Sequence, residues 1–171
     1  SVVATDAEDD EITFTVSGSE LAITSAGVLT FATEPDFETK ASYTATVTAN
    51  DGTNSTTQAI TVNIVNVNDN SPVITTSNEY SLEENTTEVG QAIATDADGD
   101  SVTFIVSGSE LAITSAGVLT FASAPDYETK AIYTATLTAT DGINLSTQNI
   151  TVNITNVLDS FKGEVIDGYI S

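Results

Sequence analysis

Apolar and polar residues alternate along most of this chain with a period of two. In ITFTV, residues 12–16, three apolar residues alternate with two threonines, and residues 43–49 and 59–65 follow the same pattern. Successive side chains of a strand point to opposite faces, so this alternation predicts strands with one buried face, as in antiparallel sheets. The abundance of Val, Ile, Thr, Phe and Tyr also favours strands over helices.

The alternating pattern recurs after ninety residues. A shift of 90 positions makes 49 of the 70 residues from 1 to 70 identical to those from 91 to 160. A period of this length is the size of a domain and too long for a solenoid repeat. We therefore expect tandem copies of one folding unit, at residues 1–70 and 71–160, with the start of a following segment or domain at 161–171.

The complete second copy predicts about seven strands and no helix, which is typical of an all-β sandwich. Gly27 and Gly117 lie in the turn of AITSAGVLTF and suit a left-handed hairpin turn. Copy one starts at the equivalent of Gln91, so it lacks the counterpart of residues 71–90 and its first strand. We expect an open sheet edge there, which the segment 161–171 or another chain would fill. The expected strands of copy two lie within 73–84 (one or two), 91–96, 102–108, 111–114, 117–122, 132–140 and 147–157.

The charge balance excludes several classes of function. The chain has 25 acidic and three basic residues, a net charge of -22, and no Cys, His or Trp. Such a chain repels nucleic acid and anionic membranes. It has no disulfide framework, no thiolate zinc site and no imidazole for catalysis or metal binding. No apolar run is long enough for a membrane helix and no signal-peptide pattern is present, so we expect a soluble piece of a longer protein.

The carboxylates collect at the ends of the expected strands. Loops of a sandwich gather at its two poles, so the position of each acidic group follows from the strand order. Few basic side chains are available to pair with these carboxylates. Two like charges about 4 Å apart cost roughly 1 to 4 kcal/mol per pair near a surface. A hard cation with six to eight oxygen ligands removes this repulsion, and Ca²⁺ is the natural choice. The acidic motifs are DAEDDE (6–11), PDFE (35–38), NDG (50–52), LEEN (82–85), DADGD (96–100), PDYE (125–128) and TDG (140–142).

The motif DADGD resembles the opening of an EF-hand loop. That loop needs Gly at its sixth position and Glu at its twelfth, where this chain has Ser101 and Ser107. It also needs flanking helices, which the alternation does not predict. The EF-hand interpretation therefore fails.

Taken in order, these motifs resemble those of the cadherin family over residues 1–160. The resemblance implies tandem cadherin-like, seven-stranded Greek-key β-sandwiches joined by a calcium-binding linker. Each motif is weak alone, whereas their order and spacing together are specific. The matching motifs are Glu-Asn (Glu84, Asn85), Asp-Ala-Asp (Asp96, Asp98), Asp-x-Glu (Asp36, Glu38 and Asp126, Glu128), Asp-Gly (Asp51, Asp141) and the linker NVNDNSP at 66–72.

The resemblance implies up to three Ca²⁺ at the junction between the copies. The site nearest copy two would use Asn68, the Asn70 carbonyl, Asp96, Asp98 and Asp141. The other two would use Asp36, Glu38, Asp69 and Asp98, with Asn66 standing where the family usually has Asp. It also implies half-sites at the two ends: Glu84, Asp126, Glu128, Asn156 and Asp159 at the C-terminal end, where Leu158 and Ser160 replace linker asparagines, and Asp6, Glu8 and Asp51 at the N-terminal end.

Near-identical copies with many Thr and Asn residues and no cysteine resemble the extension region of giant bacterial surface adhesins of the RTX type, which act in biofilms. The resemblance implies an extracellular, cell-surface spacer that Ca²⁺ stiffens for adhesion. Its partners would be neighbouring repeats of the same long chain, with any glycan or cell-surface ligand bound elsewhere in the parent protein.

Two other functions have to be weighed. The pair Asp36 and Glu38 resembles the paired carboxylates of glycosidases, but no Arg, His or Trp accompanies it, so we expect no enzyme. The stronger alternative is a carbohydrate-binding accessory module of a secreted polysaccharide-degrading protein. Such a module needs exposed aromatic side chains, and the candidates outside the expected core are Phe37, Tyr80, Tyr127 and Tyr169.

Overall fold

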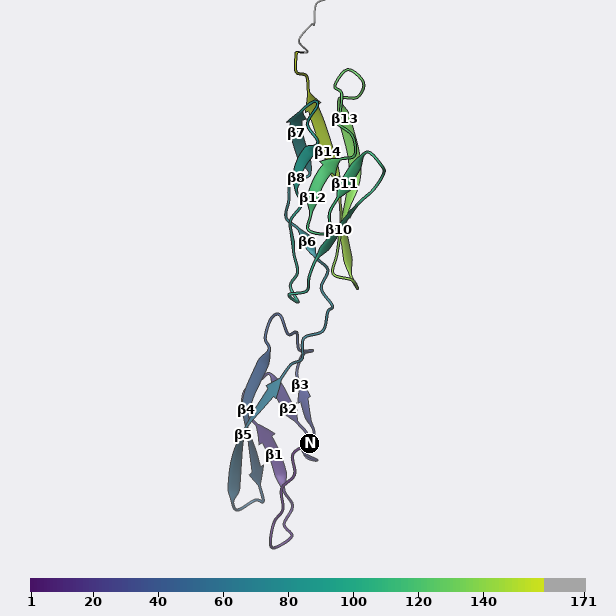
Figure 1. Ribbon diagram of the computed structural model, residues 1–171. Helices are drawn as coiled ribbons and strands as arrows, with labels where there is room; N and C mark the ends of the chain where they lie inside the picture. Colours follow the sequence, from purple (N-terminus) through teal and green to yellow (C-terminus); the bar gives the residue numbers. More distant parts are fainter. Residues whose placement is uncertain (159–171) are drawn as a thin grey trace, which may run out of the picture. The chain divides into compact units, whose positions relative to one another are not determined.

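A computed structural model describes residues 1–158 of the chain, and every regular element in that range is a β-strand. The described chain forms two compact units (Figure 1). Unit 1 comprises residues 1–68, and unit 2 begins at Asp69. The absence of helix within residues 1–158 agrees with the all-β prediction, and this range accordingly holds no helix long and apolar enough to span a bilayer.

Unit 1 contains five strands in two sheets. The pairing is antiparallel throughout, and Phe14 lies opposite Ala49 while Tyr43 lies opposite Val62. The apolar residues predicted to share a face therefore do so. One sheet has the order β1 (Thr13–Val16), β4 (Ser42–Asn50), β5 (Ser55–Asn63), and the other pairs β2 (Leu21–Ile23) with β3 (Leu29–Phe31).

Unit 2 is a complete Greek-key β-sandwich. Taking β6 with β7 and β8 with β9 as two interrupted strands, it has the seven strands that the sequence predicts. The edge strand β7 runs parallel to β14, and the other pairs are antiparallel. One sheet has the order β10 (Thr103–Val106), β13 (Ile132–Thr140), β14 (Leu145–Thr155), β7 (Glu79–Glu83); a second has β11 (Leu111–Ile113), β12 (Val118–Phe121), β8 (Glu88–Gln91); and β6 (Val73–Ile74) pairs with β9 (Ala94–Thr95).

The interrupted second strand differs from its prediction. A single strand was expected at 91–96, but β8 ends at Gln91 and β9 covers only Ala94 and Thr95. The chain changes partners between them, because β8 pairs with β12 whereas β9 pairs with β6. Alternation reports which face is buried and carries no information about a change of partner. Residues 71–90, the stretch predicted to hold the first strand, therefore contain β6, β7 and almost all of β8.

The predicted left-handed turn glycines are confirmed. Gly27 and Gly117 have φ values of 74° and 88°. Close approach of the backbone is a second reason for glycine. A Cβ on Gly117 would lie 2.4 Å from the carbonyl oxygen of Ala92, whose own N–H donates to the Gly117 carbonyl at 2.8 Å. This contact holds the chain at the point where it changes sheets.

The cores of the two units differ although their sequences agree. In unit 2, Leu119, Leu137 and Val152 are 0% exposed, and Phe121 packs edge-on against Tyr133 with ring centroids 4.8 Å apart. In unit 1 the corresponding Leu29 and Val62 are only half-buried. Since the side chains are identical at these two positions, the difference lies in what covers them.

We expect this difference to appear in amide hydrogen exchange. Ile60 and Val62 of β5 are half-buried, whereas their identical counterparts Ile150 and Val152 of β14 are 1% and 0% exposed. Less apolar burial lowers the free energy of local opening, so the two β5 amides should exchange at least about a hundredfold faster, equivalent to roughly 2.7 kcal/mol. Exchange measured by NMR on the whole chain checks this, and equal rates would contradict it.

Candidate metal centres

The first acidic cluster of unit 2 lies in the loop that follows β9. Asp96, Asp98 and Asp100 each place a carboxylate oxygen within 4.8 Å of the others. Asp96 shapes this loop, since its Oδ1 accepts the N–H groups of Asp98 at 3.0 Å and Asp100 at 3.2 Å. A short polar side chain that caps its own turn brings the following carboxylates back toward it.

Asn70 of the linker is bound into this cluster. Its backbone N–H donates to Asp98 Oδ2 at 2.9 Å, and its side-chain amide donates to Asp98 Oδ1 at 3.0 Å and to Asp69 at 2.9 Å. The Asn70 carbonyl accepts the side-chain amide of Asn144 at 3.1 Å. Asp141 positions that asparagine by accepting its backbone N–H at 2.6 Å. Asn70 is thus hydrogen-bonded directly to Asp98 and, through Asn144, to Asp141. All three residues were predicted for this site.

Asn144 was missed by sequence reasoning. Its signal was present, because Asp-Gly-x-Asn occurs in both copies, at residues 51–54 and 141–144. Asp100 was missed as well. It is exposed, and its equivalent in unit 1 is Asp10, whose N–H likewise donates to Asp6. These residues complete the loops that hold the predicted ligands.

Asp96 carries an unpaired oxygen. Its Oδ2 is buried from solvent and has no hydrogen-bond partner, while Oδ1 holds the loop. A buried polar atom without a partner costs on the order of 1 to 3 kcal/mol, so native structures rarely leave one. A cation bound at this atom would remove the cost. The surrounding donors are carboxylate and amide oxygens, the ligand set that Ca²⁺ takes in proteins, so the residues present fit Ca²⁺.

The second cluster of unit 2 centres on Glu84, directly after β7. Glu84, Asp126 and Glu128 bring carboxylate oxygens within 4.8 Å of one another, although Glu84 is only 4% exposed. Two backbone N–H groups hold the Glu84 carboxylate, that of Tyr127 at 3.1 Å and that of Val157 at 2.8 Å. These contacts tie β7 to two loops distant in the sequence.

The rest of the predicted C-terminal set lies close to Glu84. Asn156 donates its side-chain amide to Glu128 at 2.5 Å, so it belongs to the same group. Asp159 lies outside the described residues. Asp126 Oδ1 accepts the Glu128 N–H at 3.0 Å, and Oδ2 accepts the Thr129 hydroxyl at 2.7 Å. Unit 1 repeats this loop, with Asp36 accepting the Glu38 N–H and the Thr39 hydroxyl.

Hydrogen bonds keep the loop carboxylates ionised. The Thr129 hydroxyl lowers the pKa of Asp126, and the Thr39 hydroxyl does the same for Asp36. The Asn54 backbone N–H lowers the pKa of Asp51. Positive charge is engaged elsewhere in the described chain, since Lys40 pairs with Glu20 at 2.5 Å and Lys130 with Glu110 at 2.7 Å. Neither of the two described lysines therefore neutralises the negative charge of the Glu84 cluster.

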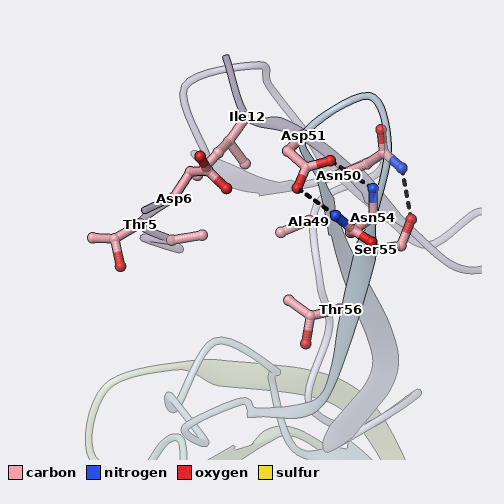
Figure 2. Close-up of a pocket in the computed structure, with 10 residues that line it drawn as sticks. Thr5, Asp6, Ile12, Ala49, Asn50, Asp51, Asn54, Ser55 and Thr56 are labelled. Carbon is pink, nitrogen blue, oxygen red and sulfur yellow. Dashed lines mark hydrogen bonds between the residues drawn. The ribbon is translucent and has the colours of Figure 1, made fainter. Parts of the chain in front are cut away.

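The remaining predicted ligands lie in unit 1. Asp6 and Asp51 line a common hollow of about 150 Å³, which Figure 2 shows with the hydrogen bonds of Asp51 to Asn54. Glu8 contributes its N–H to Asp6 at 2.9 Å. Asn66 is exposed and Asn68 is half-buried at the C-terminal end of the unit. Of the predicted N-terminal set, the structure thus brings Asp6 and Asp51 to one hollow.

The aromatic candidates for sugar binding differ in how far the structure buries them. Tyr80 was predicted to be exposed, but it packs against the core of unit 2, and burial raises the pKa of its hydroxyl. That prediction is wrong, because Tyr80 occupies the inward position of β7, a strand whose alternation was not used. Tyr127 is 38% exposed, Phe37 is half-buried, and Tyr169 lies outside the described residues.

No family model and no curated protein matches the chain. Several solved structures match the chain. Human protocadherin-24 EC1-2 has a TM-score of 0.80 at 22% identity, covering 91% of this chain and 86% of that one. Drosophila N-cadherin EC1-4 has a TM-score of 0.72 at 24% identity, covering 88% of this chain and 42% of that one. Protocadherin gammaB7 EC3-6 has a TM-score of 0.72 at 24% identity, covering 89% and 42%. The fold is therefore that of cadherin extracellular domains, as the sequence motifs imply.

Proposed function

We propose that the chain is a calcium-dependent spacer of a cell-surface adhesin, in which Ca²⁺ bound at the linker converts tandem units into a rigid rod. The observation that carries the proposal is the loop after β9. There, the linker residue Asn70 is bound to Asp98 and Asn144, while Asp96 Oδ2 is buried without a partner. An acidic site that already holds the linker is the place where a cation would restrict the linker's motion.

The residues of unit 2 have distinct roles in this proposal. Asp96 and Asp98 would bind Ca²⁺ through carboxylate oxygens, and Asp69 and Asp141 would add further oxygens. Asn144 orients the Asn70 carbonyl, which the resemblance makes a ligand. When bound, Ca²⁺ supplies the positive charge that the chain lacks. The predicted partners from unit 1, Asp36, Glu38, Asn66 and Asn68, would complete the coordination.

The setting we propose is extracellular, on the surface of a bacterial cell, within a repeat array of the RTX-adhesin type active in biofilms. Its support comes from the sequence: two copies with 49 of 70 aligned residues identical, no cysteine, and three basic residues. Extracellular modules bind Ca²⁺ with dissociation constants of roughly 0.1 to 1 mM, so such a spacer is rigid in calcium-rich surroundings. Neighbouring repeats of the same chain are its partners.

Calcium removal tests the proposal. In about 5 mM Ca²⁺ the two units should tumble as one body, whereas in EDTA carboxylate repulsion should let them reorient independently. We expect ¹⁵N relaxation to give one common correlation time with Ca²⁺ and two shorter ones without it. Small-angle scattering should show a defined maximum dimension only with Ca²⁺. Mg²⁺ at the same concentration is the control, because its smaller octahedral shell dehydrates reluctantly. Identical relaxation in Ca²⁺ and EDTA would refute the stiffening.

A further inference from the structure

Three neighbouring strands of unit 2 carry no charged residue. The chain has 25 acidic residues, yet β10, β13 and β14 contain none of them and no lysine. These strands lie side by side in one sheet (Figure 1). Their inward side chains, such as Leu137 and Val152, are fully buried, so the alternate side chains form the outer face of the sheet. We call this outer face, the odd-numbered residues of β10 and β14 and the even-numbered residues of β13, the neutral face.

The neutral face differs from its counterpart in unit 1 by three large aliphatic residues. Ile105, Ile132 and Leu145 are 61%, 56% and 61% exposed. The outer faces of β1, β4 and β5 in unit 1 carry no large aliphatic residue. Single exposed aliphatic side chains are common on protein surfaces, whereas three gained on one face of one copy indicate a surface that makes a contact. The equivalents in copy one are, in the same order, Thr15, Ser42 and Ser55.

The three aliphatic residues lie at the two ends of the neutral face. Leu145 lies opposite Thr140 at one end of β13, and Ile105 lies opposite Thr138 on the other side of that strand. Ile132 lies at the opposite end of β13, about 20 to 26 Å away at 3.3 Å per residue. Threonine hydroxyls occupy most of the positions between them. A partner therefore has to match two apolar ends and a hydroxyl-rich middle.

The middle of the face is alike in both units. In unit 2 it has a hollow of about 420 Å³, whose walls include Thr134, Thr136 and Asn149, and unit 1 has a hollow of about 400 Å³ at the equivalent place. The Thr136 hydroxyl donates to Asn149 Oδ1 at 3.1 Å. Because the hollow is common to both units, a small ligand bound in it does not explain the aliphatic residues of unit 2.

A second copy of this chain is the partner that the charges favour. With a net charge of -22, two copies repel each other wherever their acidic loops meet. The neutral face lets them approach without bringing carboxylates into contact. A threonine hydroxyl both donates and accepts hydrogen bonds, so a threonine-rich face is complementary to itself. An interface between two identical copies uses the same patch twice, so each aliphatic residue contributes twice.

The size of the neutral face predicts weak association. Its strands are about 4.8 Å apart, and the longest has 11 residues. The face therefore spans roughly 15 by 35 Å, or about 500 Å² of sheet in each copy. Two such faces bury about 1,000 Å², near the lower limit for a specific interface. We expect a dissociation constant of roughly 0.1 mM.

We propose that unit 2 binds unit 2 of a second copy through the neutral face, so that two chains associate side by side. Unit 1, whose outer face has Thr and Ser at the three positions, takes no part. No residue of the neutral face is a predicted metal ligand. The association is therefore independent of the calcium spacer function and persists in EDTA.

Sedimentation equilibrium of the 171-residue chain, up to about 1 mM and with either Ca²⁺ or EDTA, tests the proposal. We expect a reversible dimer in both conditions. The variant Ile105→Thr/Ile132→Ser/Leu145→Ser takes the residues of unit 1 and should associate at least about tenfold more weakly. Ile93→Thr is the control, because Ile93 is 54% exposed but lies outside the neutral face. A monomer at about 1 mM, an equal loss in the control, or a dimer with Ca²⁺ alone would each overturn the proposal.

Unit 1 provides the converse experiment. Thr15→Ile/Ser42→Ile/Ser55→Leu gives unit 1 the aliphatic residues of unit 2, so each chain then has two binding faces. Species larger than a dimer should appear at the concentrations where the unchanged chain forms dimers. If the distribution stays that of the unchanged chain, the three side chains do not determine the association and the assignment fails.

Salt and dilution locate the contact. Glu79 and Glu83 of β7 border the neutral face, so the dimer should tighten as salt rises from about 0.05 to 0.5 M and screens the repulsion. Backbone amide shifts that change on dilution should be confined to β10, β13, β14 and this border strand. Weaker association at high salt, or shift changes in the acidic loops or in unit 1, would show that a different surface forms the contact.

Discussion

Asparagine in place of Asp96 is expected to weaken Ca²⁺ binding at the linker end of unit 2 by at least about a hundredfold. The substitution distinguishes the roles of the two oxygens of this carboxylate. Asparagine keeps an Oδ1 that accepts the N–H groups of Asp98 and Asp100, so the loop is preserved. It replaces the buried, partnerless Oδ2 by an amide NH₂, which cannot ligate a cation. A hundredfold loss corresponds to about 2.7 kcal/mol, in the range expected for one charged ligand in a partly buried site.

The neighbouring carboxylate offers a matched control. Asp100 belongs to the same cluster but is exposed, and the motif resemblance does not make it a ligand. Asp100→Asn removes the same charge at almost the same place, so it reports the general electrostatic contribution, expected to be below about threefold at 0.15 M salt. Calorimetric titration with Ca²⁺ measures both variants. If Asp100→Asn loses as much affinity as Asp96→Asn, the site is a diffuse acidic surface and the assignment of Asp96 fails.

The sequence predicted the parts of the fold that depend on local pattern. Alternation identified the inward residues of β1, β4 and β5, because a strand's two faces follow directly from its period. The repeat predicted equivalent loops, and Asp36 and Asp126 indeed bind their Thr hydroxyls in the same way. Carboxylates at strand ends were correctly expected to gather, as Glu84 does with Asp126 and Glu128.

What the sequence did not reveal depends on contacts between distant segments. The division of the second strand at Ala92 depends on β12 and β6, which lie far away along the chain. Tyr80 was mistaken for a surface residue because its burial depends on pairing with β14. Glu84 was placed among the ligands, but nothing in its neighbours along the chain indicated burial at 4% exposure. That burial requires backbone donors from Tyr127 and Val157.

The burial of Glu84 leads to the second large effect. Glu84→Ala is expected to lower the free energy of unfolding of unit 2 by about 3 kcal/mol even in EDTA. It leaves the Tyr127 and Val157 N–H groups without an acceptor, and hydrogen bonds to a charged group contribute roughly 1.5 to 3 kcal/mol each. Relief of repulsion from Asp126 and Glu128 offsets part of this. Exchange of the buried Val152 amide, which reports on unit 2 alone, measures the change.

The adjacent residue and a second substitution separate structural from metal-binding roles. Glu83 is exposed, and Glu83→Ala should change stability by less than about 0.5 kcal/mol. If Glu84→Ala costs no more than that in EDTA, its two hydrogen bonds contribute nothing to the fold. Glu84→Gln keeps one acceptor but turns an NH₂ toward the other backbone donor, so it should cost about half as much in EDTA. Because the amide also removes the negative charge, its cost should grow when Ca²⁺ is added, whereas a purely structural carboxylate would show the same cost in both conditions.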